Sequence, residues 1–92
     1  MRGGRVDANH AAVRDEFRRL GWVVEDLSHI GHGVPDLYCE KGDKYVFAEV
    51  KDGNKPPSKR RLTEDEVFWH EILRRAGVTV RIIERVEDVA AL

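Results

Sequence analysis

The feature that most constrains the fold is a strand, a helix and a strand that follow one another between residues 45 and 83. Residues 45–51 alternate apolar and polar side chains, as a half-buried strand does. Thr63 and Glu66 match a capping box, which begins a helix, and Gly77 is placed to end it. Residues 78–83 are rich in β-branched side chains and predict a second strand. Such a unit requires a right-handed crossover, so the two strands must pair in parallel.

The chain before this unit predicts one helix and two more strands. The helix has Asp7 as its N-cap and Gly21 as its C-terminal stop, and it is indicated by apolar residues at helical spacing: Val13, Phe17 and Leu20. Residues 22–27 and 34–40 are short and rich in β-forming side chains. A short link containing Gly42 joins the second of these strands to the next one as a tight hairpin. Short links favour an antiparallel meander for the first three strands.

Three further segments complete the predicted fold. Residues 52–61 are a loop, because Pro56 and Pro57 exclude both a helix and a central strand. The helix after the capping box carries an apolar stripe made of Trp69, Leu73 and Ala76, widened by Phe68 and Ile72. Residues 86–92 predict a short terminal helix. The element order is αβββαβ, which makes residues 1–92 a single α/β domain.

Composition limits the partners that this chain can have. Hydrophobic residues at 41% and charged residues at 36% are typical of a globular protein and exclude a disordered one. Sixteen Lys and Arg residues against 17 Asp and Glu residues give a net charge of −1, so a polyanion must be met by a local basic patch. No apolar run reaches bilayer length, and residues 1–5 lack the apolar stretch of a secretory signal. With Cys39 as its single cysteine, we expect a cytoplasmic protein without a membrane partner.

An acid and a base lie side by side on the predicted strand 45–51. Glu49 and Lys51 are two residues apart, so their side chains point to the same face. Asp36 follows Pro35 at the start of the preceding strand, and antiparallel pairing brings that start close to the end of strand 45–51. We therefore expect Asp36, Glu49 and Lys51 to converge at one edge of the sheet.

Two carboxylates at such short range repel each other, and a hard divalent cation such as Mg²⁺ relieves the repulsion. A metal ion of this kind serves phosphate chemistry, because it polarises a phosphoryl oxygen and lowers the pKa of a bound water. A nearby ammonium group can orient the attacking water or offset developing charge. Taken alone, these residues also fit an ion pair on a solvated strand face and an Asp in a turn after a Pro. The wider pattern distinguishes the two interpretations.

The wider pattern consists of residues 33–37 (GVPDL), a hairpin, residues 49–51 (EVK), a basic loop and a helix led by Leu62 and Thr63. It resembles the PD-(D/E)XK nuclease superfamily, and more closely the small stand-alone form of the VRR-NUC (virus-type replication-repair nuclease) family. The resemblance runs from the first helix to the last strand. It implies a restriction-endonuclease-like αβββαβ core, with a mixed four-stranded sheet flanked by helices, in agreement with the element order predicted above.

In that family the Asp of the first motif and the Glu of the second bind the metal, assisted by the carbonyl between Glu and Lys, while the Lys acts on the attacking water. Matched by position, the resemblance implies that Asp36, Glu49 and the carbonyl of Val50 bind Mg²⁺ or Mn²⁺, and that Lys51 is the water-orienting residue. It also implies a Mg²⁺-dependent endodeoxyribonuclease whose products carry 5′-phosphate and 3′-hydroxyl ends. A structure-specific role in replication or repair follows, with branched DNA such as a Holliday junction as the expected target.

Two positions depart from the family pattern. Family members often place a Gln in the helix after Glu-x-Lys, near the position of Glu66 or Val67, and this chain contains no Gln. Many also carry an acid in the first helix, where the matching position here is Ala12, with Asp15 or Glu16 as substitutes. The number of bound metal ions therefore stays open at this point.

A cluster of cations lies directly downstream of the proposed site: Lys55, Lys59, Arg60 and Arg61. Lys and Arg side chains on a loop can hold the phosphates that flank a cleaved bond without reading bases. A solvated surface loop is the alternative. One domain of this size offers one cutting site, so symmetrical cleavage of two strands requires a homodimer, for which Trp and Phe on the second helix are candidate contacts.

Two other functions compete with the structure-specific endonuclease. The first is a noncatalytic DNA-binding or adaptor module that keeps the nuclease fold. The second is a sequence-specific restriction-type endonuclease, although 92 residues leave little surface for reading bases. Among the remaining candidates, His29 and His32 are interpreted as loop histidines near the active edge, and His70 has no assigned role.

Overall fold

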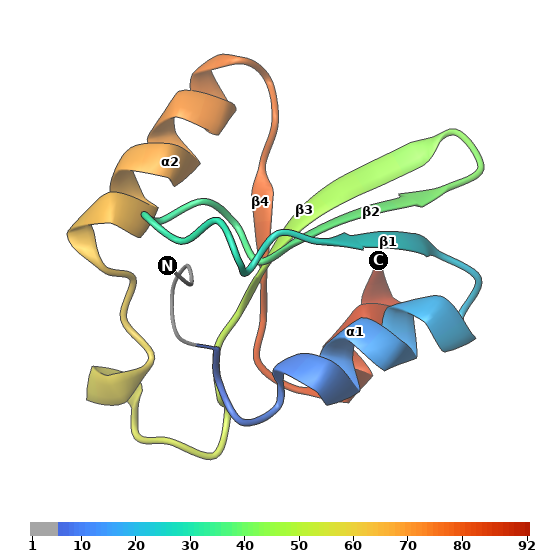
Figure 1. The fold of residues 1–92 in the computed structure, drawn as a ribbon, viewed down its shortest axis with the longest axis horizontal. Coiled ribbons are helices and arrows are strands. Elements are labelled where there is room, and N and C mark those ends of the chain that lie inside the picture. Colours follow the sequence, from blue (N-terminus) through green and yellow to red (C-terminus); the bar gives the residue numbers. More distant parts are fainter. Residues whose placement is uncertain (1–5) are drawn as a thin grey trace.

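A computed structural model of the chain describes residues 6–92, so the prediction made for residues 1–5 lies outside the described residues. Four strands form one mixed sheet in the order β1-β2-β3-β4 (Figure 1). The strands are β1 (Val23–Asp26), β2 (Leu37–Lys41), β3 (Lys44–Val50) and β4 (Val80–Ile83). Two α-helices, α1 (His10–Arg19) and α2 (Glu64–Arg75), and two 3-10 helices, η1 (Pro57–Lys59) and η2 (Val86–Ala91), complete the fold.

The pairing of the strands confirms the predicted topology. The pairs β1–β2 and β2–β3 are antiparallel, with Cys39 opposite both Val24 and Val46. Strand β4 pairs in parallel with β3, which places Glu49 beside Ile82. The connection between β2 and β3 is a two-residue turn, and its positive φ of 63° at Gly42 is a conformation that glycine adopts without strain.

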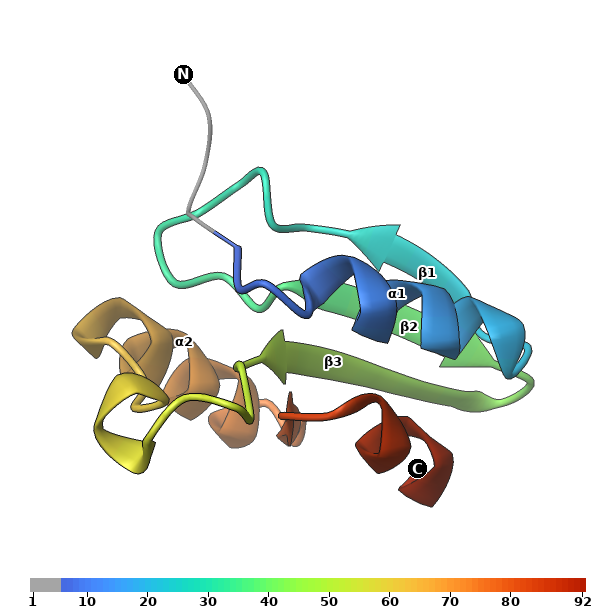
Figure 2. The same cartoon turned by 90° about the horizontal axis from the view of Figure 1, so that it is seen from below.

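Helix α1 and η2 cover one face of the sheet and enclose the hydrophobic core with it (Figure 2). Val13 and Phe17 of α1 are fully buried, as predicted from their spacing, and they pack with buried residues of the sheet and of η2: Leu37, Cys39, Ala48, Val50, Ile83 and Val89. Phe17 also contacts Trp22 edge to face, with ring centroids 5.6 Å apart. The core therefore lies between α1, η2 and one face of the sheet.

Helix α2 lies on the other side of the sheet, away from α1 (Figure 1). Its N-terminus has the predicted capping box, in which Thr63 and Glu66 exchange hydrogen bonds. None of its residues is buried, however. The predicted stripe is only half-buried at Trp69 and Leu73, and Ala76 and Phe68 are exposed. The apolar spacing of this helix therefore does not mark a core face.

Several predicted boundaries differ from the structure. Asp7 does not cap α1, because the N-cap residue is Asn9, whose amide instead donates to the carbonyls of Lys51 and Glu84. Strand β2 begins at Leu37, so Asp36 lies just before the strand. The predicted loop 52–61 includes the 3-10 helix η1, which is compatible with its prolines because Pro57 occupies the first helical position. The terminal helix is a 3-10 helix, η2.

Candidate active site

Asp36, Glu49 and Lys51 meet in one pocket, as their places in the sequence predict. The pocket has a volume of about 340 Å³ and is also lined by His32 and Glu66. Each wall comes from a different element: the loop before β2, the end of β3 and the first turn of α2. The pocket therefore lies at the C-terminal end of β3, the strand that pairs with β2 on one side and with β4 on the other.

Asp36 is held in place by hydrogen bonds to backbone groups of two neighbouring segments, one at the end of β3 and one just after β1. Its carboxylate accepts a hydrogen bond of 2.8 Å from the backbone N–H of Val50. Its own carbonyl accepts from the N–H of Leu27, also at 2.8 Å, which extends the β1–β2 pairing by one step. The residue is thus held in a defined position although it lies outside the strand.

Glu49 is almost completely buried, with 1% of its surface exposed. Burial, the charge of Asp36 and a hydrogen bond to that carboxyl group raise the pKa of Glu49 well above its usual range. Burial also raises the pKa of Asp36, although the Val50 N–H opposes the shift. Two adjacent carboxyl groups with raised pKa values favour the binding of a proton or of a cation between them.

The donor set of the pocket fits Mg²⁺ or Mn²⁺. Within residues 6–92, no cluster of three or more His, Cys, Asp or Glu side chains is arranged to hold a metal ion. The pocket instead offers the two carboxylates of Asp36 and Glu49, next to the backbone of Val50. Mg²⁺ keeps several waters and is commonly held by one or two carboxylates, so two side chains are sufficient. The raised pKa values of both carboxyl groups mark this as a place where a positive charge is favoured.

Lys51 is a buried cation with one close partner. Its Nζ lies 2.7 Å from Oε1 of Glu66, and both side chains are largely shielded from solvent. Burial lowers the pKa of Lys51, but the hydrogen bond and the charge of Glu66 outweigh this effect and raise it. For Glu66 burial raises the pKa, and Lys51 together with the N–H of Thr63 lowers it overall. Both groups therefore stay charged at neutral pH.

His70 reaches the site from α2, although the sequence alone assigns it no role. Its Nε2 lies 3.1 Å from Oε1 of Glu49, and its side chain is 16% exposed. Burial lowers the pKa of His70, which favours the neutral ring. One signal is present in the sequence, because Glu66 and His70 are four residues apart and so share one face of a helix.

The loop between β1 and β2 forms a wall of the pocket. Three consecutive residues, Gly31, His32 and Gly33, have positive φ values of 71°, 56° and 84°. A side chain on Gly33 would place its Cβ 2.4 Å from the backbone carbon of Asp65, so only glycine permits this approach to α2. Of the two loop histidines predicted to lie near the active edge, His32 lines the pocket and His29 does not.

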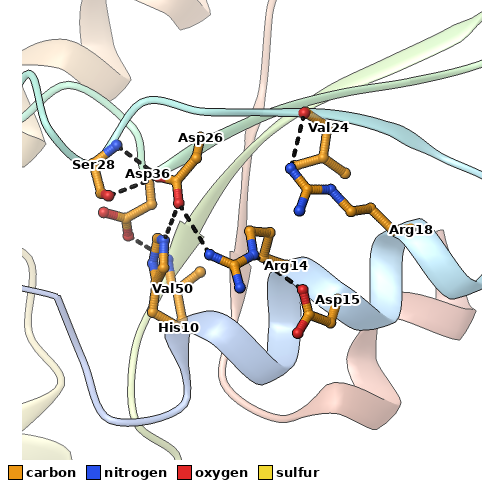
Figure 3. Close-up of polar contacts among 9 residues, drawn as sticks. All are labelled: His10, Arg14, Asp15, Arg18, Val24, Asp26, Ser28, Asp36 and Val50. Atoms are coloured by element: carbon orange, nitrogen blue, oxygen red, sulfur yellow. Dashed lines mark hydrogen bonds and ion pairs between the residues drawn. The ribbon is translucent and has the colours of Figure 1, made fainter.

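A polar network anchors this loop to α1 (Figure 3). Asp26 accepts hydrogen bonds from the backbone and the hydroxyl of Ser28, and it lies 3.0 Å from Nε2 of His10. Although burial opposes it, these contacts lower the pKa of Asp26 to about 2. Arg14 adds a cation 3.7 Å from the same carboxylate. The network fixes the point at which the loop leaves β1.

The four predicted phosphate-binding cations divide into two groups. Lys55, Lys59 and Arg61 are exposed, and Lys55 lies 3.5 Å from Asp7 at the edge of the pocket. Arg60 instead directs its guanidinium to Glu84, at 3.0 Å, and is partly buried. Three cations of the cluster thus lie at the surface, one of them paired with Asp7, and the fourth joins the loop to the residue after β4.

The acids of the first helix do not reach the pocket. Asp15 pairs with Arg14 and is exposed, and Glu16 forms a two-pronged hydrogen bond with Arg19. Neither residue lines the pocket. Glu66 does line it, at one of the two positions where related sequences are expected to carry a Gln.

Comparison with known proteins supports the same fold. No protein-family model matches the chain, and no curated protein matches it. A solved structure described as a VRR_NUC domain is similar to it, with a TM-score of 0.67 and 28% sequence identity. The similarity covers 94% of this chain and 95% of that one. This likeness confirms the fold that the sequence predicts, over nearly the whole length of both chains.

Proposed function

On the premise that this chain is a VRR-NUC domain, a nuclease-type fold, we propose that it is a metal-dependent DNA endonuclease. The observation that supports this most is the meeting of Asp36, Glu49 and Lys51 in one pocket that opens to solvent. An acid pair that can bind a cation, next to a buried ammonium group, is an arrangement suited to phosphodiester hydrolysis.

The roles of the residues follow from their contacts. Asp36 and Glu49 would hold Mg²⁺ or Mn²⁺ with the carbonyl of Val50, and the bound ion supplies charge stabilisation and a more acidic water. Lys51 orients the attacking water. The water oxygen forms a bond to phosphorus and releases a proton to solvent, the bond from phosphorus to the 3′ oxygen breaks, and that oxygen takes up a proton from solvent. The products then carry a 5′-phosphate and a 3′-hydroxyl group.

Exposed cations on the loop after the active-site strand favour DNA as the substrate. Lys55, Lys59 and Arg61 extend from the loop that connects β3 to α2, and they can hold the phosphates next to the cleaved bond. Replacing all three by Ala should weaken binding equally for all sequences. The slope of log affinity against log salt should become shallower by about 0.7 to 0.9 for each phosphate that the variant no longer binds. An unchanged slope would remove this loop from the DNA-binding surface.

We further propose that the enzyme acts on branched DNA, such as a Holliday junction, as a homodimer. Apolar side chains of α2 and β4 remain exposed on the α2 side of the sheet: Val67, Phe68, Ile72 and Ile82. A second copy could cover them, which would provide two cutting sites related by symmetry. Sedimentation at micromolar concentration tests the dimer, and a monomer at every concentration would contradict it.

The function is tested by one panel of labelled DNA substrates. Branched, flapped and linear DNA are incubated with Mg²⁺, with Mn²⁺ and with EDTA. We expect metal-dependent cleavage that is fastest on branched DNA and that Lys51→Ala slows by about 10² to 10⁴ fold. Binding without cleavage would favour the noncatalytic adaptor, and cleavage that follows one sequence regardless of DNA shape would favour a restriction-type enzyme.

A further inference from the structure

Helix α2 contacts the active site through two polar side chains. Glu66 and His70 are one helical turn apart, and they contact Lys51 and Glu49, which are two residues apart on one face of β3 and its continuation. The spacing of the two helical residues thus matches the spacing of the two strand residues. Each acidic or basic group of the site that faces α2 has its own partner on the helix.

These contacts are well shielded, whereas the rest of the helix is not. The side chains of Lys51, Glu66 and His70 are 11%, 16% and 16% exposed, and that of Glu49 is 2% exposed. No residue of α2 is buried in the way that Phe17 of α1 is. The helix therefore meets the site through polar contacts that fix direction, more than through apolar packing.

Each contact fits the role of the group that it holds. Nε2 of His70 lies 3.1 Å from Oε1 of Glu49, and a Glu49 that is ionised because it binds a cation would accept a hydrogen bond from Nε2–H of this ring. Glu66 uses the same oxygen, Oε1, to accept from Lys51 and from the backbone N–H of Thr63. The ammonium group of Lys51 is thereby tied to the capping box that begins α2.

We propose that Glu66 and His70 are positioning residues, through which α2 aligns Lys51 and Glu49 for catalysis. This inference rests on the proposed nuclease function. Glu66 keeps the Lys51 ammonium at a fixed point in the pocket that Asp36 and Glu49 also line. His70 holds one oxygen of Glu49, which leaves the other free to bind a cation. Neither residue needs to touch the substrate.

Metal affinity tests the role of His70 without any cleavage assay. Calorimetric titration with Mn²⁺ should show that His70→Phe, which keeps the ring but removes the donor, weakens binding by about 10 to 100 fold. His70→Gln places an amide donor near the position of Nε2 and should restore most of the affinity. If His70→Phe binds Mn²⁺ as tightly as the parent protein, or if His70→Gln rescues nothing, the role is refuted.

Steady-state kinetics test the role of Glu66. Glu66→Gln retains an oxygen for the Thr63 N–H but loses the charge that holds Lys51, so we expect kcat to fall by about tenfold with little change in KM. Glu71→Gln makes the same chemical change on an exposed part of the same helix, and it should leave both constants unchanged. A Glu66→Gln enzyme that matches the Glu71→Gln control would overturn the inference.

A spectroscopic measurement separates this inference from the proposed function. In ¹⁵N-histidine-labelled protein, long-range nitrogen spectra identify which ring nitrogen of His70 carries the proton. The Nε2–H form is expected after Mn²⁺ is replaced by diamagnetic Mg²⁺, and the Nδ1–H form would refute the contact with an ionised Glu49. If the protein binds Mg²⁺ with this tautomer but cleaves no DNA, the proposed function fails while the alignment by α2 stands.

Discussion

The two faces of the sheet are held by different kinds of contact. On the face covered by α1 and η2, fully buried apolar residues such as Phe17 and Leu37 form the core. On the face beside α2, the buried side chains of Glu49 and Lys51 are held by His70 and Glu66. The α1 face is stabilised mainly by buried apolar side chains, whereas the α2 face holds charged side chains that line the pocket.

Strand β3 contributes to both faces. Ala48 and Val50 point into the core, and Glu49, which lies between them, points to the pocket with Lys51. Because successive side chains of a strand point to opposite faces, burying Ala48 and Val50 in the core directs Glu49 and Lys51 to the pocket. The comparison teaches that the α2 face can bury charged side chains, which contribute less to stability, because the apolar core on the opposite face supplies the stability.

The largest expected difference between the faces is in stability. Phe17→Ala should reduce the free energy of unfolding by about 3 to 5 kcal/mol, because it leaves a cavity in the core. Phe68→Ala, on α2, should change it by about 0.5 kcal/mol or less in the monomer, because this side chain is 60% exposed. Urea unfolding at low protein concentration measures both. Equal losses would show that α2 also belongs to the core.

A change inside the pocket should stabilise the protein while it removes activity. Glu49→Gln resembles the protonated acid, so its folding needs no uptake of a proton at this site, and it keeps an oxygen for His70. We expect the free energy of unfolding at pH 8 to rise by about 1 to 2 kcal/mol and metal-dependent cleavage to disappear. Thermal unfolding of the two proteins across pH is the measurement.

The sign of the pH effect follows from the raised pKa of Glu49. A carboxyl group whose pKa is higher in the folded state than its ordinary 4.5 stabilises the fold most below pH 4.5, and this contribution is lost as pH rises through the folded pKa. The advantage of Glu49→Gln should therefore grow with pH above 4.5. Added Mg²⁺ should restore the parent protein at pH 8 but not the variant. An advantage that shrinks with pH would contradict this account.

The smallest expected effect concerns the start of α2. Thr63→Ala removes the hydroxyl that accepts from the N–H of Glu66 and should destabilise the helix by about 1 kcal/mol. Because α2 has no buried residue, we expect this loss to appear as faster hydrogen exchange of α2 amides, with little change in α1 and β3. Faster exchange throughout the chain would instead show that α2 unfolds only with the core.

The order and pairing of the elements are predictable from the sequence because local signals and topology agree in this chain. The capping box at Thr63 and the spacing of Val13 and Phe17 are both confirmed. The prediction of Asp7 as the N-cap is wrong because Asn9, two residues later, is bonded to carbonyls of distant segments. Such long-range contacts are invisible to a local pattern.

The convergence of the three central side chains is also predictable, because register and alternation follow from the hairpin. Their partners are not. The sequence indicates a capping role for Glu66 and no role for His70, because the rotation of α2 against the sheet depends on packing. The apolar stripe of α2 predicts more burial than the helix has, since periodicity alone cannot show how closely a helix approaches a sheet.

The close approach of Gly33 to α2 joins two walls of the pocket. Its α-carbon lies against the backbone of Asp65, in the first turn of α2, at a distance that excludes even a methyl group. The loop and the helix, on two sides of the pocket, therefore touch through main-chain atoms, which cannot rotate aside as side chains do. A larger residue at position 33 would therefore push the loop away from α2 and change the shape of the pocket between them.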